Sequence, residues 1–280
     1  MQISQPVART AFYCCILRAD DARSSTPVCG DSFAERFIDD DVRRDLAPLL
    51  GLGAPAASNV ARHRIIDDLI REQLASDPNR RVILIGAGFD TRACRIKGGR
   101  WFELDDPPLL AFKEQRLPVA EALNPLTRIP VVFDADPPER YLAPLAGDDQ
   151  ALVIVEGVSM YLSDSAIATL ATTLAKALPR ATLVCDLMSP AFARTFSAPL
   201  RNALSKMGAR FGERHGHPIR QVETAGYRCL KRISIPGRAG EAGTLKIPRW
   251  VLATFLRVLR DGYQVFVFQI PAPCSLIPDP

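Results

Sequence analysis

The amino-acid sequence predicts an α/β fold with one doubly wound, mostly parallel β-sheet. From residue 79 onward, short apolar runs alternate with segments of helical spacing. Strand-helix alternation of this kind implies right-handed crossovers and parallel strands. At residues 82–85, a run of Val-Ile-Leu-Ile leads directly into Gly86-Ala87-Gly88, and a buried parallel strand delivers a tight ligand-binding turn in this way. We therefore expect a ligand site at the end of this first strand.

The length and composition exclude several classes of protein. The chain has 280 residues, of which 48% are apolar, and this suffices for a sizeable core. The formal net charge is only +4, with Lys and Arg interspersed among Asp and Glu, so we expect no nucleic-acid partner. Seven cysteines form an odd set without a Cys-x-x-Cys pair, which predicts reduced, mostly buried thiols in a cytosolic protein.

No segment of the sequence has the pattern of a membrane anchor. The apolar run at residues 11–17 is not followed by a small-residue cleavage site, so we do not expect a secretory signal. Residues 151–162 are interrupted by Glu156 and are too short to cross a bilayer. We expect a cytoplasmic protein that binds a small molecule and has no membrane partner; the sequence does not indicate an oligomeric state.

Hydrophobic periodicity and turn residues give the expected elements in order. Apolar spacing predicts N-terminal helices over residues 7–19, 33–50 and 58–74. Strands are expected at residues 81–85, 100–104, 129–133, 152–155 and 182–185, and helices at 91–96, 107–123, 139–145 and 164–178. Residues 229–235 and 264–270 are expected to complete the sheet, with a helix that includes residues 250–259 between them.

A different pattern follows the fifth strand. Phe192, Phe196, Leu200 and Leu204 recur at helical spacing, which suits either a lid over the carboxyl edge of the sheet or an ordinary packing helix. We interpret residues 1–280 as a single domain. Within it, residues 1–78 form a helical preamble, residues 79–188 and 226–272 form the sheet core, and residues 189–225 form the lid.

The glycine loop narrows the choice of cofactor. A dinucleotide-binding fingerprint requires a small residue at the position of Thr91, and a phosphate-binding loop requires a Gly-Lys-Ser/Thr sequence that does not follow here. A loop with neither completion fits S-adenosylmethionine better, because that molecule has no phosphate groups.

Acidic residues follow the next three expected strands. Glu103 and Asp105 end the second strand, where a carboxylate can accept both ribose hydroxyls; the alternative for Glu103 is a solvated pair with an arginine. Asp134 follows the third strand and either approaches the adenine or caps a helix. Glu156 ends an apolar fourth strand before Gly157. Burying such a lone carboxylate costs several kcal/mol unless it is paired.

Four segments match known motifs in their correct order. Residues 86–92 read Gly-Ala-Gly-Phe-Asp-Thr-Arg, and residues 102–107 read Phe-Glu-Leu-Asp-Asp-Pro. Residues 156–162 read Glu-Gly-Val-Ser-Met-Tyr-Leu, and residues 62–68 read Arg-His-Arg-Ile-Ile-Asp-Asp. Together they resemble the leucine carboxyl methyltransferase-like family, which includes bacterial S-adenosylmethionine-dependent O-methyltransferases of the tetracenomycin type.

The resemblance implies a class I methyltransferase (Rossmann-like) fold with seven strands, the last antiparallel, an N-terminal helical extension and an inserted helical lid. It implies S-adenosyl-L-methionine as cofactor and S-adenosyl-L-homocysteine as product. The activity would be O-methylation of a carboxylate or hydroxyl of a small molecule, such as a polyketide-type metabolite. A nicotinamide-dependent oxidoreductase, against which Thr91 argues, and a non-catalytic S-adenosylmethionine-binding protein are the alternatives.

The resemblance also implies roles for individual residues. Arg62 would bind the methionine carboxylate and Glu156 would lie near the amino group, as charge pairing would also select. The other cofactor-binding positions would be Gly86, Ala87 and Gly88 at the methionine moiety, Asp105 at the ribose, and Asp134 and Ala135 at the adenine.

The acceptor side is less defined by the sequence. Tyr161 is the candidate for orienting the acceptor, with structural packing as the alternative. Asp90 and Arg92 are expected to brace the loop. His63 stands where the resembled family usually has Thr, and none of the three histidines lies at an obvious base position, which favours an acceptor that is a carboxylate or an acidic enol-like hydroxyl. We expect no metal site.

Overall fold

A seven-stranded sheet forms the centre of the protein. The computed structural model describes residues 6–133, 135–206, 208, 211–213, 215–245, 247, 251, 254 and 256–271. The sheet has the order β3-β2-β1-β4-β5-β7-β6, and β7 runs antiparallel to both of its neighbours. The strands are β1 Arg81–Ile85, β2 Arg100–Asp105, β3 Leu126–Pro130, β4 Leu152–Val155, β5 Thr182–Met188, β6 Arg228–Ser234 and β7 Tyr263–Gln269. The expected doubly wound sheet with an antiparallel seventh strand is thus confirmed.

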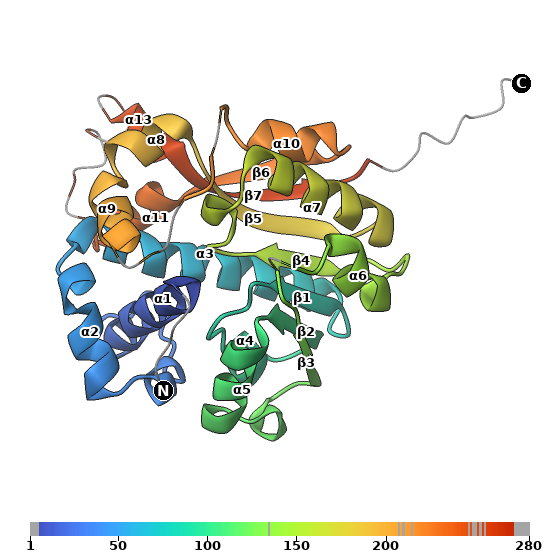
Figure 1. The fold of residues 1–280 in the computed structure, drawn as a ribbon, viewed down its shortest axis with the longest axis horizontal. Helices are drawn as coiled ribbons and strands as arrows, with labels where there is room; N and C mark the ends of the chain where they lie inside the picture. The colour runs from blue at the N-terminus through green and yellow to red at the C-terminus, as the bar shows by residue number, and fades with distance from the viewer. Residues whose placement is uncertain are drawn as a thin grey trace, which may run out of the picture.

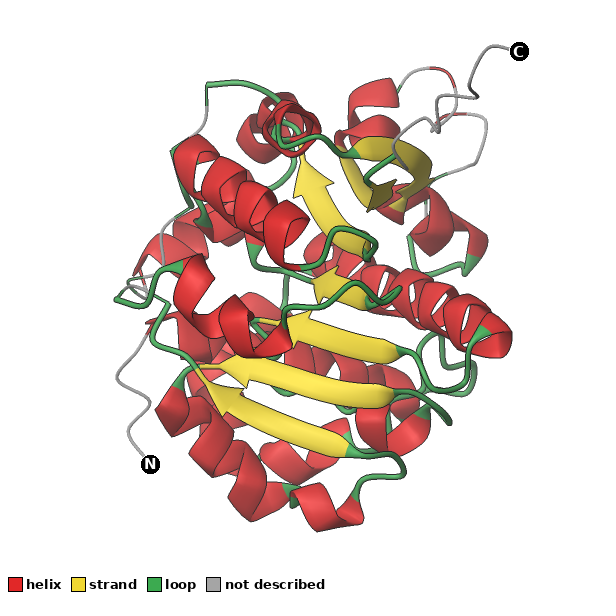
Figure 2. Ribbon diagram, turned by 90° about the vertical axis from the view of Figure 1, so that its right-hand side faces the viewer, coloured by secondary structure: helices red, strands yellow, loops and turns green. Residues whose placement is uncertain are grey.

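Helices cover both faces of the sheet (Figure 2). Their bounds are α1 Pro6–Ala22, α2 Asp40–Leu50, α3 Gly53–Ser76, α4 Arg92–Arg95, α5 Pro107–Arg116, α6 Pro138–Leu142, α7 Asp164–Ala177, α8 Pro190–Thr195, α9 Ala198–Lys206, α10 Ile219–Thr224, α11 Ile235–Glu241 and α13 Arg257–Gly262. Alternate residues of a strand point to opposite faces. Val82 and Leu84 therefore pack with α3 and α11, whereas Ile83 and Ile85 pack with α6 and α7.

The N-terminal helices pack against the glycine loop and α5 (Figure 1). Phe89, directly after the loop, contacts Phe12 of α1 with ring centroids 4.5 Å apart and stacks on Phe37 at 4.8 Å. Arg18 of α1 donates from Nη2 to the backbone oxygen of Phe89 at 2.7 Å, and its Nε lies 2.9 Å from the fully buried carboxylate of Asp31. The helical preamble is therefore bonded to the loop that it covers.

Several expected boundaries are wrong, for identifiable reasons. The third strand was expected at residues 129–133, but β3 ends at Pro130. β3 is an edge strand and needs few buried side chains. Its polar residues Thr127 and Arg128 therefore interrupt the apolar pattern from which strands were predicted. Beyond it the backbone turns, because the Val132 nitrogen donates to Asp136 and the Val132 oxygen accepts from the Ala135 nitrogen.

Two long expected helices are shorter in the structure. Residues 33–50 contain a short 3-10 helix and then α2, which begins after Asp39 caps it by accepting from the Val42 nitrogen. α5 ends at Arg116, ahead of Pro118, instead of continuing to residue 123. The segment at residues 189–212 contains α8 and α9. The end of the helix expected at residues 250–259 coincides with the start of α13, whereas residues 250, 252, 253 and 255, and residue 272, lie outside the described residues.

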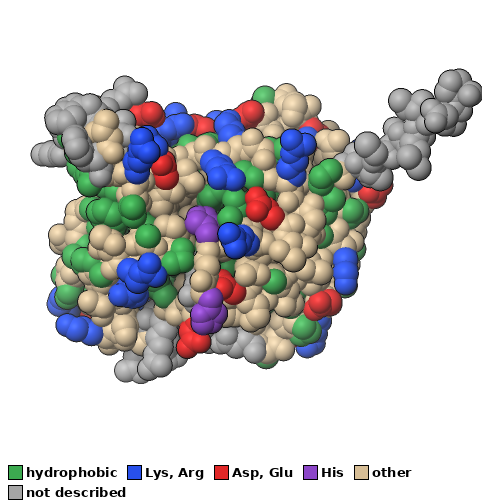
Figure 3. Space-filling view, turned by 90° about the horizontal axis from the view of Figure 1, so that it is seen from above, with side chains coloured by type: hydrophobic (Ala, Val, Ile, Leu, Met, Phe, Trp, Pro, Cys, Tyr) green, Lys and Arg blue, Asp and Glu red, His purple; other side chains and the backbone are tan. Residues whose placement is uncertain are grey.

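The surface agrees with the charge pattern of the sequence. Figure 3 shows one face on which basic and acidic side chains are interspersed. None of the described helices is long and apolar enough to cross a membrane. The six cysteines in the described part of the chain are free thiols.

The Arg18–Asp31 ion pair provides a test of how the preamble is anchored. We expect Arg18→Met to lower the free energy of unfolding by about 3 kcal/mol, because it removes a guanidinium from a fully buried carboxylate. Arg44→Met is the matched control: Arg44 and its partner Asp41 are 74% and 84% exposed, so stability should not change measurably. Urea unfolding of the two variants makes the comparison, and equal effects would contradict the anchoring role.

Candidate functional site

A cavity of about 930 Å³ opens at the carboxyl ends of the parallel strands. Residues that end or follow β1, β2, β4 and β5 line it, together with residues of α1 and α3. This is the edge at which ligands bind in open α/β sheets, and the volume is at the upper end for a small-molecule site. The cavity has a polar part around the glycine loop and an apolar part beneath α8 and α9.

The glycine loop closes tightly on the end of β2. Gly86 and Gly88 have positive φ angles of 70° and 50°, a conformation that favours glycine. A Cβ at Gly86 would also lie 2.4 Å from Cγ2 of Val158. The Gly86 and Ala87 nitrogens donate to the Leu104 oxygen at 2.9 and 3.0 Å. All three residues of the loop line the cavity.

Asp105 joins the loop to the second strand. Its carboxylate accepts from the Gly88 nitrogen at 2.6 Å and from the Asp106 nitrogen at 2.7 Å. Burial raises the pKa of Asp105 to about 6 despite these two donors. The carboxylate is thus held rigidly at the cavity wall. Its raised pKa indicates that the two backbone donors do not fully compensate for its burial.

Glu103, by contrast, belongs to the core. It is buried, and its Oε2 lies 2.9 Å from Nζ of Lys113 and 3.1 Å from Nε of Arg128. Glu103 does not line the cavity. The expected alternative, a solvated pair with an arginine, is wrong in one respect: Glu103 pairs with Arg128, but both side chains are buried.

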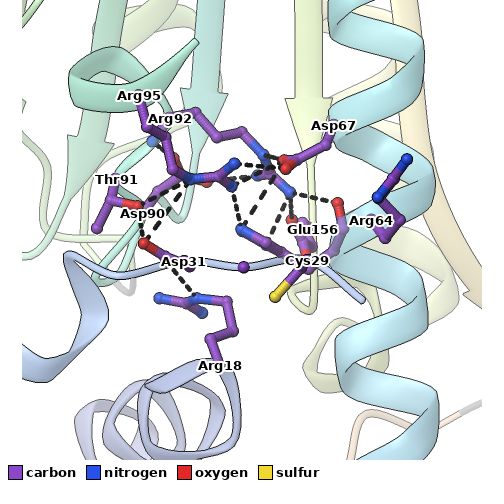
Figure 4. A network of polar contacts seen from close by, with 12 residues as sticks. Arg18, Cys29, Asp31, Arg64, Asp67, Asp90, Thr91, Arg92, Arg95 and Glu156 are labelled. Carbon is purple, nitrogen blue, oxygen red and sulfur yellow. Dashed lines mark hydrogen bonds and ion pairs between the residues drawn. The ribbon is translucent and has the colours of Figure 1, made fainter. Parts of the chain in front are cut away.

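A cluster of buried guanidinium groups and carboxylates lies beside the loop (Figure 4). We call it the ion cluster; its members are Arg18, Asp31, Arg62, Asp67, Asp90, Arg92, Arg95, Glu156 and Asp186. It contains five carboxylates and four guanidinium groups, and its member Asp67 also pairs with the partly exposed Arg71, whose Nη2 lies 3.6 Å from Oδ2. The carboxylates of the ion cluster are thus balanced by guanidinium groups of the chain itself.

Glu156 lies at the centre of the ion cluster. Its Oε1 accepts from Nε of Arg62 at 3.1 Å, and its Oε2 lies 2.8 Å from Nη2 of Arg92. Arg92, His63 and Arg62 hold the pKa of Glu156 well below its usual range, which outweighs its burial. The side chain keeps 14% of its surface exposed, toward the cavity that it lines. Its charge is thus stabilised but still accessible to a ligand.

Two residues that the sequence analysis missed complete the environment of Arg62. Tyr263 of β7 accepts from Nη1 of Arg62 at 2.7 Å and donates to Oδ2 of Asp186 at 2.7 Å. Asp186 also accepts from the Gly157 nitrogen at 2.6 Å. In the sequence Asp186 directly follows the strand expected at residues 182–185, as Glu156 follows the one at residues 152–155, so the same signal was present, although β5 continues past Asp186 to Met188. Nothing in the sequence marked Tyr263.

Asp90 and Arg92 brace the loop, as expected. Arg92 is fully buried; its Nε donates to Oδ1 of Asp67 at 2.6 Å, and its Nη1 contacts Asp90. In the described part of the chain, His63, Asp90 and Glu156 form one group whose ligand atoms could hold a metal ion. Arg92 contacts all three of them, so its guanidinium lies where a metal ion bound by these residues would lie.

The other part of the cavity is apolar. Its wall comes from the segment after β5 and from the chain before β7, with these described residues: Met188, Phe192, Phe196, Leu200, Leu204, Leu245, Ile247, Leu256 and Leu259. Tyr161 lies between the two parts, and its ring packs edge-on against Phe211 at 5.9 Å. Burial raises the pKa of Tyr161 to about 12, so its hydroxyl is a neutral hydrogen-bonding group.

The structure brings most of the expected site residues together. The cavity is lined by Arg62, Gly86, Ala87, Gly88, Asp105, Glu156 and Tyr161. Ala135 is exposed and does not line the cavity, because the turn after β3 points it outward; Phe133 and Asp136 on either side line it instead. Asp134 lies outside the described residues. The ligand roles of all these residues stay predictions.

Comparison with known proteins links this geometry to a family. The model of the leucine carboxyl methyltransferase family matches residues 11–175, more than half of the chain. This range includes residues 11–78 of the preamble, the glycine loop and Glu156.

Curated relatives match parts of the chain. A Streptomyces coelicolor protein provisionally named an S-adenosyl-L-methionine-dependent methyltransferase is 39% identical over 122 residues, which are 41% of this chain. The match spans less than half of that relative, 42% of its length. The tetracenomycin polyketide synthesis O-methyltransferase TcmP of Streptomyces glaucescens is 25% identical over 239 residues, 84% of this chain and 85% of its own.

A solved structure agrees with the fold. The crystal structure of a DUF574 family protein from Streptomyces avermitilis matches with a TM-score of 0.55, over 92% of this chain and 97% of that chain. The sequences are 12% identical, so this likeness concerns the fold alone.

The raised pKa of Asp105 predicts a pH dependence of stability. Between about pH 4 and 6 the folded protein binds more protons at Asp105 than the unfolded chain does, so its contribution to the free energy of unfolding increases as the pH falls. We expect the stability of the wild type, relative to Asp105→Asn, to increase by about 2 kcal/mol from pH 7 to pH 4.5. Urea unfolding at both pH values measures this, and a difference independent of pH would contradict it.

Proposed function

Because the chain belongs to the leucine carboxyl methyltransferase family, we propose that it is an S-adenosyl-L-methionine-dependent O-methyltransferase. Its acceptor would be a carboxylate or hydroxyl of a small, largely apolar molecule such as a polyketide-type metabolite. The observation that carries the proposal is that Arg62, Glu156, the glycine loop and Asp105 line one cavity, which continues into an apolar chamber.

The residues of the polar part fit the cofactor. S-adenosyl-L-methionine carries a sulfonium, an ammonium and a carboxylate, and the cavity offers both a carboxylate, Glu156, and a guanidinium, Arg62, to its amino-acid end. Glu156 would hold the ammonium group and Arg62 the carboxylate. Asp105, whose buried carboxylate accepts from only two backbone nitrogens, would accept further hydrogen bonds from the ribose hydroxyls. The cofactor supplies an electrophilic methyl carbon.

The chain's own contribution to the reaction would be positioning and the exclusion of water. The helices α8 and α9 supply Phe192, Phe196 and Leu204 to the apolar chamber, which supports the lid interpretation of residues 189–225. Apolar side chains there would exclude water and align the acceptor with the methyl group, and such alignment can provide most of the acceleration. Tyr161, at the junction of the two parts, would orient the acceptor oxygen through its hydroxyl.

The ionisation of the lining residues supports an acceptor that needs no strong base. Glu156, which lines the cavity, already accepts a hydrogen bond from Arg62, and Asp186, which also contacts Arg62, accepts one from Tyr263. A carboxylate acceptor is ionised at neutral pH, whereas a phenol has a reference pKa near ~10. This arrangement favours a carboxylate or an acidic enol-like hydroxyl. The relative named for tetracenomycin polyketide synthesis supports the polyketide class.

Calorimetry and turnover test the proposal together. S-adenosylhomocysteine should bind at one site per chain, and NADH should not bind. Binding of NADH alone would overturn the methyltransferase assignment in favour of an oxidoreductase. Incubation with S-adenosylmethionine and a panel of aromatic carboxylic acids, enols and phenols should yield S-adenosylhomocysteine with some of them. Cofactor binding without turnover of any acceptor would favour the non-catalytic alternative.

Asp105 provides the sharpest test of the cofactor site. Asp105→Ala should weaken the binding of S-adenosylhomocysteine by about 1–3 kcal/mol, the scale of lost hydrogen bonds to a charged group. Asp148→Ala is the control, because Asp148 is 78% exposed and pairs only distantly with Arg180. Calorimetry should show unchanged affinity for the control. Unchanged affinity in Asp105→Ala would remove Asp105 from the site.

The role of Tyr161 can be separated from packing. Tyr161→Phe keeps the ring against Phe211 but removes the hydroxyl. We expect kcat to fall roughly tenfold, the effect of one lost hydrogen bond to the acceptor, with the KM for S-adenosylmethionine unchanged. Steady-state kinetics with the best acceptor measures both constants. An unchanged kcat would show that Tyr161 serves only packing.

A further inference from the structure

His63 lies inside the ion cluster, and the proposed function does not yet use it. Its imidazole extends from α3, is only 2% exposed and lines the cavity. Both ring nitrogens lie close to guanidinium groups: Nδ1 is 2.7 Å from Nη2 of Arg92, and Nε2 is 2.6 Å from Nη2 of Arg95. A neutral imidazole has one donor and one acceptor nitrogen, whereas a guanidinium only donates. Because both nitrogens face a guanidinium donor, the distance from each nitrogen to a carboxylate oxygen decides which of them carries the proton.

Arg95 requires Nε2 of His63 as an acceptor. Nη2 of Arg95 has two hydrogens, of which one is donated to Oδ1 of Asp67 at 2.9 Å. The other faces Nε2 of His63. A hydrogen on Nε2 would point at this donor, and the nearest carboxylate oxygen for it, Oδ1 of Asp67, is 3.9 Å away. Nε2 is therefore unprotonated.

Arg92 does not require Nδ1 of His63 in the same way. One hydrogen of its Nη2 is donated to the backbone oxygen of His63 at 3.1 Å and the other faces Nδ1 at 2.7 Å, but Nη2 also forms an ion pair with Oε2 of Glu156 at 2.8 Å, which can hold Arg92 without Nδ1. Nδ1 lies 3.4 Å from Oε1 of Glu156, which can accept its hydrogen. Burial and the charge of Arg92 lower the pKa of His63, so the ring carries a single proton. This proton belongs on Nδ1.

We propose that His63 is a positioning residue whose Nδ1–H donates to Glu156 and holds that carboxylate in place for the ammonium group of the cofactor. The inference rests on the proposed function, because the ammonium is that of S-adenosylmethionine. Oε1 of Glu156 accepts from Arg62 and His63, and Oε2 forms an ion pair with Arg92. Of the roughly four acceptor positions of a carboxylate, one on Oε2 is left for the ligand.

The proton position can be measured without any ligand. The chain contains only three histidines, so a long-range proton–nitrogen correlation spectrum of protein labelled with ¹⁵N-histidine resolves them, and the signals lost in His63→Asn identify His63. We expect the pattern of a neutral ring protonated on Nδ1 at pH 7. A ring protonated on Nε2, or on both nitrogens, would overturn the proposal.

Two isosteric variants test the effect on cofactor binding. The amide of Asn replaces Nδ1 and keeps a donor for Glu156, whereas the amide of Gln replaces Nε2 and keeps only an acceptor for Arg95. We expect calorimetry with S-adenosylhomocysteine to give His63→Asn a Kd within threefold of the wild type and His63→Gln a Kd at least tenfold weaker. Equal losses, the reverse order, or a split that follows the melting temperatures would overturn the proposal.

The outcomes separate this inference from the proposed function. If the wild type binds no S-adenosylhomocysteine, the proposed function fails, and the nuclear magnetic resonance spectrum alone decides the protonation of His63. If the wild type binds it and the two variants do not differ, the positioning role of His63 is overturned while the proposed function stands.

Discussion

Burial of the Glu156 carboxylate at the end of β4 is the constraint on which the site depends. A lone carboxylate in this position would cost several kcal/mol, so the chain brings the guanidinium groups of Arg62 and Arg92 onto it. Arg62 comes from α3 and Arg92 from the start of α4. Neutralising one side chain thus ties the preamble and the loop after β1 to the centre of the sheet.

The same ion pairs explain why the site can be both rigid and receptive. Arg92 is enclosed by three carboxylates, and Arg62 is fixed by Asp186 and Tyr263. Removing any one partner would leave a buried charge uncompensated, which usually costs more than the pair contributes. Glu156 and Arg62 still line the cavity, while the adjoining chamber under α8 and α9 presents apolar surface. Charge and apolar surface thus meet within one cavity, as methyl transfer from a sulfonium to an apolar acceptor requires.

Sequence patterns predict the polar part of this site well, because its residues lie within motifs directly after strands, and the carboxyl ends of parallel strands converge at one edge. Gly86, Asp105 and Glu156 are of this kind. Tyr263 could not be predicted, because it reaches Arg62 only through the pairing of β7 with β5. The resemblance implied Ala135 beside the adenine, but Ala135 is exposed and does not line the cavity, because the chain turns after β3. The tautomer of His63 depends on distances that no spacing encodes.

A crystal structure of the protein with S-adenosylhomocysteine tests the central claim most directly. The account predicts the ammonium group within hydrogen-bond distance of Glu156, the carboxylate at Arg62 and the ribose hydroxyls at Asp105, with the sulfur facing the apolar chamber. A ligand bound elsewhere, or one whose amino-acid end lies away from Glu156 and Arg62, would contradict it.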